Sequence, residues 1–356
     1  MSTARKNRGL VIVDGSVQHW ALRAVLIAIT VLALIWASSL AAFRVGQFTN
    51  VFVLAIAIVG LNMVTGYTGL LSIGHSAFFG LGAYTTGILI VKSGFSPLET
   101  IPIAIALGFI VGLFVGLPSL RIKGLYLALV TLAVGVSFPE IVRRFEDLTG
   151  GAAGMVVRSR QLTPPEWTGL TRAERGIWMF WLSAAVLILV MWLARNLVRS
   201  RFGLAMTAVR DNEIAAAANG INIARTKILI FGVSGAVTAL AGSLFAQYIG
   251  ALSPDGSFTL MKSIELVTGL VLGGIATNIG PIVGAFAVVF LPYWTASVTE
   301  GPLSGVVFGV ILIAIVFVMP EGIVGRITIW LRKVLTILPA DHPDVRPRVK
   351  EEALTT

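Results

Sequence analysis

The sequence predicts an all-α polytopic membrane protein, and three observations lead to this class. Hydrophobic residues make up 56% of the 356 residues, whereas charged residues make up only 12%, about half the fraction found in ordinary globular domains. The mean hydropathy is +0.90. Several apolar runs reach the roughly 20 residues that a helix needs to cross a bilayer. This composition excludes a water-soluble globular fold.

Ten apolar runs follow one another, and we expect about ten transmembrane helices. The runs cover approximately residues 24–42, 51–65, 74–91, 101–117, 124–142, 177–194, 224–250, 264–279, 280–298 and 303–319. The first run, with its basic leader and Ala37-Ser38-Ser39, also fits a cleaved signal peptide, but the rest of the chain is equally hydrophobic. The boundary between the eighth and ninth runs depends on Asn278-Ile279-Gly280-Pro281, which could also be a break within one irregular helix pair.

The distribution of positive charge predicts that both termini are cytoplasmic. With ten spans, 18 of the 27 Lys and Arg residues fall on that side, as the positive-inside rule requires. The net charge of +10 is therefore assigned to cytoplasmic loops and not to nucleic-acid binding. The predicted parts are a cytoplasmic N-terminal segment (1–23), a transmembrane domain (24–320) with an extracellular loop (143–176) and a cytoplasmic loop (195–225), and a cytoplasmic tail (321–356).

Two stretches, 60–87 and 269–285, place glycines and small polar residues at membrane depth. Broken helices are tolerated there only against protein or water, and paired interruptions in two pseudo-repeated halves indicate a transport pathway near the midplane. Close helix packing through glycine is the alternative explanation. We expect non-helical backbone in 65–76 and 277–280. The candidate pathway residues are Asn62, Thr65, Tyr67, Thr68, Ser72, His75, Ser76, Thr277 and Asn278.

Ionisable residues within the runs are few. His75 fits either a role in the pathway or an imidazole that is hydrogen-bonded to a neighbouring helix. Lys262 precedes Glu265 by three residues, a spacing at which the two side chains pair on a helix. We expect this pair to be structural. Because no charged clamp for an ammonium or a carboxylate group is evident in the runs, discrimination among solutes is expected to rest with another protein.

No catalytic or metal site is predicted. The chain has no Cys, and its three His residues are far apart in sequence, which excludes disulfides and a local metal cluster. None of the seven lysines follows a glycine, so the phosphate-binding loop that ends Gly-Lys-Ser/Thr is absent. ATP hydrolysis by that route must come from another polypeptide.

The loop 195–225 contains a short helix with its own start and stop signals. Asp211 or Asn212 can cap its first turn, Gly220 can end it, and Asn222 can cap the next span. A helix of about two turns is marginal in water, so it must dock either on this protein's own membrane ends or on a cytoplasmic partner. The candidate residues for this docking are Arg210, Asp211, Asn212, Glu213, Ala216, Ala217 and Gly220.

Four segments resemble the LivM-type permease of branched-chain amino acid ABC importers, a family whose relatives also carry urea and short amides. They are residues 66–84, 120–132, 149–155 and 200–235, and their order is that of the family across residues 50–320. The resemblance implies a non-enzymatic subunit that translocates branched-chain or similar small amino acids by alternating access. It also implies the bacterial inner membrane as the location, without cofactor or metal in this chain.

The resemblance further implies partners. These are a second homologous permease subunit, two cytoplasmic ATPase subunits that bind ATP and magnesium, and an extracellular substrate-binding protein. Glu213 and Gly220 match a helix that couples such permeases to the ATPase, although their separation of seven residues departs from the usual six. The alternatives are a permease for urea, short amides or another small polar solute, and an autonomous ion-coupled transporter, which would need intramembrane acids. A membrane enzyme would need a catalytic constellation that the sequence lacks.

Overall fold

A computed structural model describes residues 10–13, 17–122, 124–298 and 303–338. By contacts, the chain divides into one unit of residues 41–324 and another formed by residues 1–40 and 325–356. The predicted N-terminal segment and C-terminal tail lie partly outside the described residues, at 1–9, 14–16 and 339–356.

The larger unit is built almost entirely of helices. Its elements are α2 (Ala42–Leu61), the π-helix η1 (Asn62–Tyr67), α3 (His75–Ser93), α4 (Pro97–Gly116), η2 (Leu117–Leu120), α5 (Leu125–Arg144), α6 (Glu146–Thr149), η3 (Gly151–Ala153), β2 (Met155–Val156), η4 (Ser159–Leu162), η5 (Glu166–Thr168), η6 (Arg172–Glu174), α7 (Arg175–Arg199), α8 (Arg201–Asp211), α9 (Glu213–Ala218), α10 (Ile223–Ile249), β3 (Ala251–Leu252), α11 (Pro254–Ser257), α12 (Leu260–Gly273), α13 (Gly280–Val298) and α14 (Leu303–Val318). Strands β2 and β3 pair antiparallel, with Met155 opposite Leu252.

The smaller unit contains β1 (Leu10–Val13), α1 (Val17–Ser38), most of α15 (Gly322–Val334) and β4 (Leu335–Leu338). Strands β1 and β4 pair in parallel, with Leu10 opposite Leu335.

Five helical stretches of the described residues are long and apolar enough to cross a membrane. They are Ala42–Tyr67, Pro97–Leu120, Leu125–Arg144, Arg172–Arg199 and Ile223–Ile249, and the bent pair Gly305–Val318 with Gly322–Trp330 makes a sixth candidate. The prediction of a helical membrane protein is confirmed at this level. Length and hydropathy identify five or six candidate spans among the described residues, in part because α12 has only 14 residues, about 21 Å at 1.5 Å per residue. The expected number of about ten stays a prediction.

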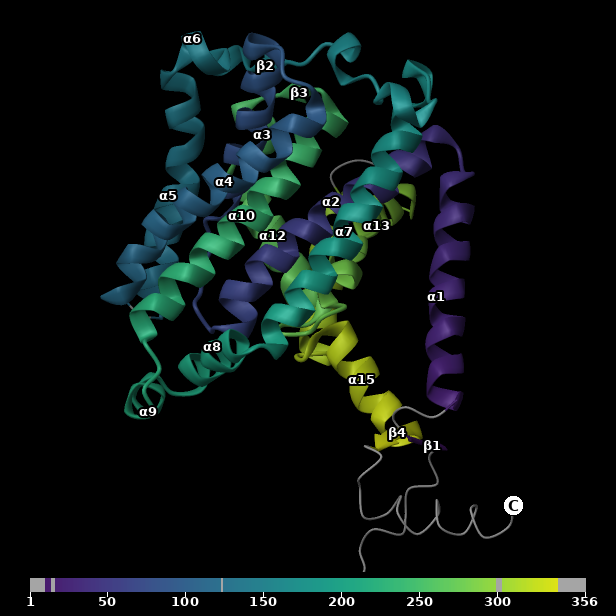
Figure 1. Ribbon diagram of the computed structural model, residues 1–356, viewed down its shortest axis with the longest axis vertical. Helices are drawn as coiled ribbons and strands as arrows, with labels where there is room; N and C mark the ends of the chain where they lie inside the picture. The colour runs from purple at the N-terminus through teal and green to yellow at the C-terminus, as the bar shows by residue number, and fades with distance from the viewer. Residues whose placement is uncertain (1–9, 14–16, 123, 299–302, 339–356) are drawn as a thin grey trace, which may run out of the picture. The chain divides into compact units, whose positions relative to one another are not determined.

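Helices α2 and α10 form the centre of the larger unit (Figure 1). The most apolar windows of these two helices are 83% and 78% buried, whereas that of α4 is only 28% buried. Helix α10 packs against α4, α3 and α2. Neighbouring helices therefore bury the apolar residues on nearly all sides of α2 and α10. Helix α4, by contrast, presents much of its apolar surface outward.

The contact between α3 and α10 depends on two glycines. A Cβ atom on Gly82 would lie 1.9 Å from the Ala239 carbonyl oxygen, and one on Gly242 would lie 1.8 Å from the Phe79 carbonyl oxygen. No other residue fits at either position without separating the backbones. Close packing of helices through glycine, the alternative explanation for glycine-rich runs, therefore holds for this helix pair.

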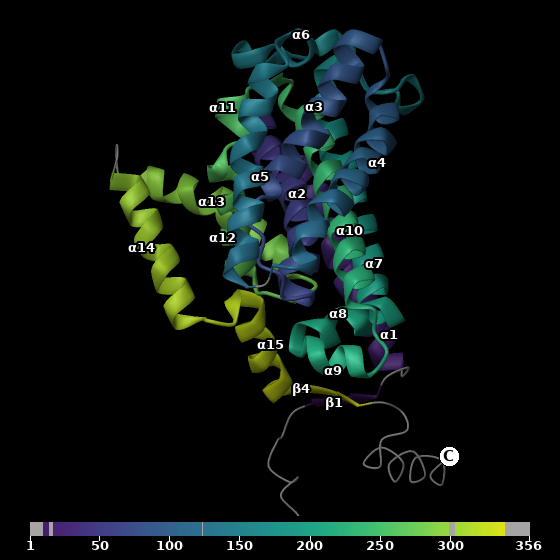
Figure 2. The same cartoon turned by 90° about the vertical axis from the view of Figure 1, so that its left-hand side faces the viewer.

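The two ends of the larger unit carry different structures. Helices α8 and α9 lie at one end, and α6 with the β2–β3 pair lies at the other (Figures 1 and 2). Helix α10 connects the two ends, because it begins shortly after α9 and ends directly before β3.

Candidate functional site

Both stretches that were predicted to be interrupted contain non-helical backbone. The π-helix η1 follows α2, and residues 68–74 are non-helical before α3 begins at His75. Residues 274–279 are non-helical between α12 and α13. Ala276 has a φ of 56°, a left-handed conformation that is uncommon for a residue with a side chain. Single turns of π-helix are frequent at functional sites.

Asn62 joins the two interrupted segments to each other. Its Nδ2 donates to the Thr277 carbonyl oxygen at 2.9 Å, and its Oδ1 accepts from the Ala276 amide at 2.9 Å. A Cβ atom on Gly66 would lie 2.8 Å from the Ala276 nitrogen, so glycine allows this approach. Segments more than 200 residues apart in the chain thus form one structure, through a residue that the sequence analysis had selected.

Three of the predicted threonines stabilise backbone groups of these segments. Thr65 donates to the Leu70 carbonyl at 3.1 Å, and Thr68 donates to the Met63 carbonyl at 2.9 Å. Thr277 donates to the Gly274 carbonyl at 2.7 Å and accepts from the Gly280 amide at 3.1 Å. Side chains thus satisfy backbone groups that would pair with one another in a regular helix. Tyr67 and Asn278 are partly buried at the same two segments.

His75 is buried and links three helices. Its Nδ1 contacts the Ser72 hydroxyl at 2.9 Å, and its Nε2 contacts the Ser234 hydroxyl at 2.7 Å. Ser234 donates its one hydroxyl proton to the Gly60 carbonyl at 2.7 Å, so it accepts from Nε2–H. The imidazole therefore connects α3 with α2 and α10, as expected for a histidine that is hydrogen-bonded to a neighbouring helix.

Ser76 connects α3 with α12. Its amide donates to the Ser263 hydroxyl at 3.0 Å, and that hydroxyl donates to the Ser76 hydroxyl at 2.8 Å. Ser234 and Ser263 were not among the residues predicted from the sequence. Both are polar residues within apolar helices, and this is the signal by which they could have been found.

The short helix α9 is capped as predicted. Asn212 accepts from the Ile214 and Ala215 amides at 2.9 and 3.0 Å, and Gly220 has a φ of +80° at the end of the helix. Asp211 does not cap the helix but pairs with Arg210 at 3.1 Å. The predicted cap of the next helix is also present, because Asn222 accepts from the Arg225 amide at 2.9 Å.

The exposed face of α9 differs sharply from its buried face. Ala216 is 3% exposed, whereas Ile214 is 82% exposed, and Ala217 is also exposed. An isoleucine with this exposure on a helix of only six residues leaves an apolar surface open to a partner.

Two side-chain contacts attach α8 and α9 to the rest of the larger unit. Glu213 forms an ion pair of 2.6 Å with Lys227 of α10, whose side chain is 1% exposed, and Lys227 also reaches the Ser119 carbonyl at 3.4 Å. Arg210 donates to the Gly66 carbonyl of η1 at 3.3 Å. Lys227 is one of the 18 basic residues that the sequence assigns to the cytoplasmic side, and no partner was predicted for it. Its place one turn into an apolar helix was the signal that it needs a partner.

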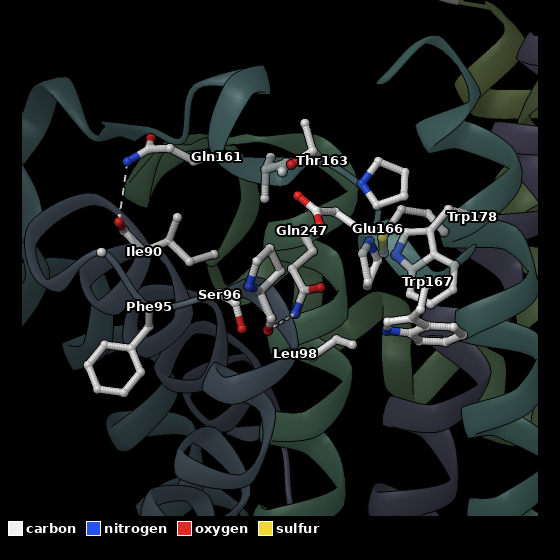
Figure 3. A pocket seen from close by; sticks show the side chains of 16 residues that line it. Ile90, Phe95, Ser96, Leu98, Gln161, Thr163, Glu166, Trp167, Trp178 and Gln247 are labelled. Carbon is white, nitrogen blue, oxygen red and sulfur yellow. Dashed lines mark hydrogen bonds between the residues drawn. The ribbon is translucent and has the colours of Figure 1, made fainter. Parts of the chain in front are cut away.

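A cavity of about 480 Å³ opens at the other end of the larger unit (Figure 3). It lies between the α3–α4 turn, the segment 161–167, the start of α7 and the end of α10. Gln247 donates to the Pro97 carbonyl at 3.0 Å in its wall, and Trp167 meets Trp178 edge to face with ring centroids 5.7 Å apart. The sequence analysis did not identify this cavity. Within the part of the chain that is described, no group of three or more His, Cys, Asp or Glu residues could hold a metal ion.

Comparison with known proteins gives one family match. Residues 43–316 match the family described as "Branched-chain amino acid transport system / permease component". The chain is 30% identical over 282 residues to the high-affinity branched-chain amino acid transport system permease protein LivM of Escherichia coli (strain K12), a match that covers 74% of this chain and 66% of LivM. No solved structure matches the chain.

Two further relatives carry different names. The chain is 28% identical over 296 residues to the high-affinity branched-chain amino acid transport system permease protein LivH of the same organism, covering 76% of this chain and 91% of LivH. It is 32% identical over 223 residues to the autoinducer 2 import system permease protein LsrC of Enterobacter sp. (strain 638), covering 58% of each chain.

Proposed function

This chain belongs to the family of permease components of branched-chain amino acid transport systems, and from that premise we propose that it is the membrane-spanning permease subunit of an ATP-binding-cassette importer. The family supplies permeases and not ATPases, in agreement with the prediction that this chain does not hydrolyse ATP. We further propose branched-chain or similar small amino acids as its substrates, with translocation by alternating access.

The mechanistic part of this proposal is based on the contacts that helices α8 and α9 make with the rest of the unit. Arg210 reaches the Gly66 carbonyl of η1, and η1 is joined through Asn62 to the interrupted segment 274–279. A displacement of α9 by an ATPase would therefore act on both interrupted segments. Those segments line the proposed pathway, whose residues are Asn62, Thr65, Tyr67, Thr68, Ser72, His75, Ser76, Thr277 and Asn278. The proposed coupling residues are Arg210, Asp211, Asn212, Glu213, Ala216, Ala217 and Gly220.

We propose an arrangement of ten spans in two pseudo-repeated halves, with both termini and the loop 195–225 in the cytoplasm and the loop 143–176 outside. In this arrangement α3 and α12 are shorter spans that begin or end at an interrupted segment. The charge distribution supports the orientation. It places α9 at the cytoplasmic end and the 480 Å³ cavity at the outer end.

The proposed assembly contains a second, homologous permease, two ATPases that bind ATP and magnesium, and an extracellular substrate-binding protein in a bacterial inner membrane. Similarity to both LivM and LivH supports the pairing of two related permeases. The name of LsrC shows that one relative belongs to a system for another solute. A small polar solute such as urea or a short amide is therefore the alternative substrate.

Reconstitution of the complete assembly in liposomes tests the proposal. We expect uptake of radiolabelled leucine that requires ATP, with competition by isoleucine and valine and none by excess urea. Uptake that follows a proton or sodium gradient without ATP would support an autonomous transporter instead. Competition by urea but not by isoleucine would support the alternative substrate.

A further inference from the structure

An ion pair on α12 lies next to Ser263, which contacts Ser76 near the start of α3. Lys262 and Glu265 are 2.6 Å apart, which confirms the pairing expected from their spacing. The Lys262 ammonium also lies 5.9 Å from the centroid of the Phe79 ring and 5.6 Å from that of the Phe245 ring, within the range of cation–π attraction. The pair is thus held between α3 and α10, one residue from the Ser263–Ser76 contact.

The depth of the pair follows from its neighbours. Ser76 follows His75, which bonds to Ser234, the twelfth of the 27 residues of α10. A hydrocarbon core about 30 Å thick covers about the central 20 residues of such a helix. Ser234 falls within that range, and Lys262 and Glu265 flank Ser263, which contacts Ser76, so the pair lies near the level of Ser234.

The pair is not enclosed within the chain. The Glu265 side chain is 30% exposed and that of Lys262 is 14% exposed, and Met261 and Ile264 beside them are 74% and 45% exposed. An ionised pair at this depth does not face lipid but protein or a water-filled path. The exposed face of α12, formed by Met261, Ile264 and Glu265 with Lys262 at its edge, therefore faces an aqueous path or a partner.

We propose that this face of α12 is a binding site for the zwitterion of an aliphatic α-amino acid on its way through the membrane. The inference rests on the proposed permease function and states which chemistry that pathway recognises. The substrate carboxylate pairs with Lys262, and the substrate ammonium pairs with Glu265. The aliphatic side chain lies against Met261 and Ile264.

The exchange keeps every charge paired, since one ion pair is replaced by two. Urea and short amides carry no formal charge and cannot replace either partner. The site therefore favours amino acids over those solutes, which gives this subunit a share in discrimination that the sequence analysis had assigned to another protein.

Substitutions in the reconstituted importer separate this role from a structural one. Glu265→Gln removes the partner of the ammonium, and we expect leucine uptake to fall at least about tenfold. The double variant Lys262→Met with Glu265→Met removes both charges, which restores a neutral and packed interior. We expect the double variant to remain as inactive as the single one. Recovery of uptake in the double variant, or normal uptake in Glu265→Gln, would overturn the proposal.

Glu140→Gln is a matched control, because Glu140 forms an ion pair with the same i, i+3 spacing at 2.5 Å with Arg143 and is 67% exposed. It should leave leucine uptake within about twofold of wild type. Absence of ATP-driven uptake in the wild type would count against the proposed function and not against the site, which a second measurement tests independently.

Cysteine protection is that measurement, because the native chain has no Cys. Ile264→Cys should react with a small methanethiosulfonate reagent, and leucine at about four times its dissociation constant should slow the reaction about fivefold by mass action. Leucinamide and urea should not slow it. Ile141→Cys, on the 53% exposed position of α5, should show no protection. Equal labelling of Ile264→Cys with and without leucine would overturn the proposal.

Discussion

At the residue scale, Lys227 shows how one ion pair can hold a peripheral helix. Its side chain is 1% exposed and pairs with Glu213, which is 22% exposed. Removal of one partner from a buried pair costs about 3 to 5 kcal/mol, and the partial exposure of Glu213 favours the lower end. Glu213→Gln should therefore lower the thermal unfolding temperature of the purified permease and speed hydrogen exchange of the α9 amides.

The control for this prediction removes the second charge as well. Glu213→Gln combined with Lys227→Met leaves no buried ion and should regain most of the lost stability. Asp211→Asn breaks an exposed pair with Arg210 and should change the free energy of unfolding by less than about 1 kcal/mol. An unchanged unfolding temperature for Glu213→Gln alone would show that the buried pair does not hold α9.

Asn62 provides a second test at this scale, because one amide connects two distant segments. Asn62→Ala leaves the Ala276 amide and the Thr277 carbonyl without their partner, at a cost of about 1 to 3 kcal/mol for each group that stays buried. The Ala276 amide should then exchange faster with deuterated solvent. Asn62→Asp keeps the acceptor and should preserve protection at Ala276 better than Asn62→Ala. Equal exchange in all three proteins would contradict the role given to this side chain.

Local residue roles could be predicted from the sequence, whereas long-range ones could not. The caps Asn212 and Asn222 bond to amides two or three residues away, so their identity and spacing suffice. One of the two partners of His75, Ser234, is 159 residues away, and no pattern within one helix identifies it. Asn62 was selected only because it lies in an interrupted run, and its partners required the fold.

At the element scale, α9 is the part whose integrity should decide coupling. Proline in a helix interior costs about 3 kcal/mol relative to alanine, and α9 has only six residues. Ala216→Pro should therefore disorder α9 and abolish ATP-driven uptake at matched membrane levels, while the permease still inserts. Ala216→Gly, which costs about 1 kcal/mol, should show an intermediate loss.

Crosslinking tests whether α9 contacts the ATPase at all. A cysteine that replaces the exposed Ala217 should crosslink to the ATPase in at least one nucleotide state, and the same cysteine combined with Ala216→Pro should not. Normal uptake by Ala216→Pro, together with no crosslink in any nucleotide state, would leave α9 as a packing element and favour an ion-coupled transporter.

Helix positions followed from apolar runs, but helix boundaries at the interruptions did not. The predicted eighth run covered 264–279, whereas α12 ends at Gly273 and residues 274–279 are non-helical. Hydropathy does not mark this end, because Ile275 and Ile279 continue the apolar pattern. The Gly273-Gly274 pair and the left-handed Ala276 end the helix instead, and the Asn62 side chain stabilises the resulting loop.

At the scale of the whole molecule, composition alone was enough to predict a membrane protein. The number of spans also depends on the level in the helix bundle at which each helix begins and ends. Charge counting treats every apolar run as a full crossing. The structure contains helices such as α3 that begin at the level of the middle of α10, where His75 meets Ser234. Helix α3 has 19 residues but is not among the helices that are both long and apolar enough to count as candidate spans. Counting apolar runs and counting such helices therefore give different numbers of spans.

The orientation of the larger unit can be tested with two cysteines at its two ends. Ser159 begins η4, two residues before Gln161 of the 480 Å³ cavity, and Ala217 lies in α9 at the other end of the unit; both are exposed. Helix α10 separates these ends by about 40 Å, since it has 27 residues at 1.5 Å each.

Because the native chain has no Cys, each single variant carries one thiol in this subunit. A membrane-impermeant maleimide should label Ser159→Cys in intact spheroplasts and Ala217→Cys only in inverted vesicles. The positive charges around α8 and α9 predict this result, since they remain on the cytoplasmic side during insertion. Labelling of Ser159→Cys only in inverted vesicles would reverse the orientation and leave α9 outside the cell, where no ATPase could reach it.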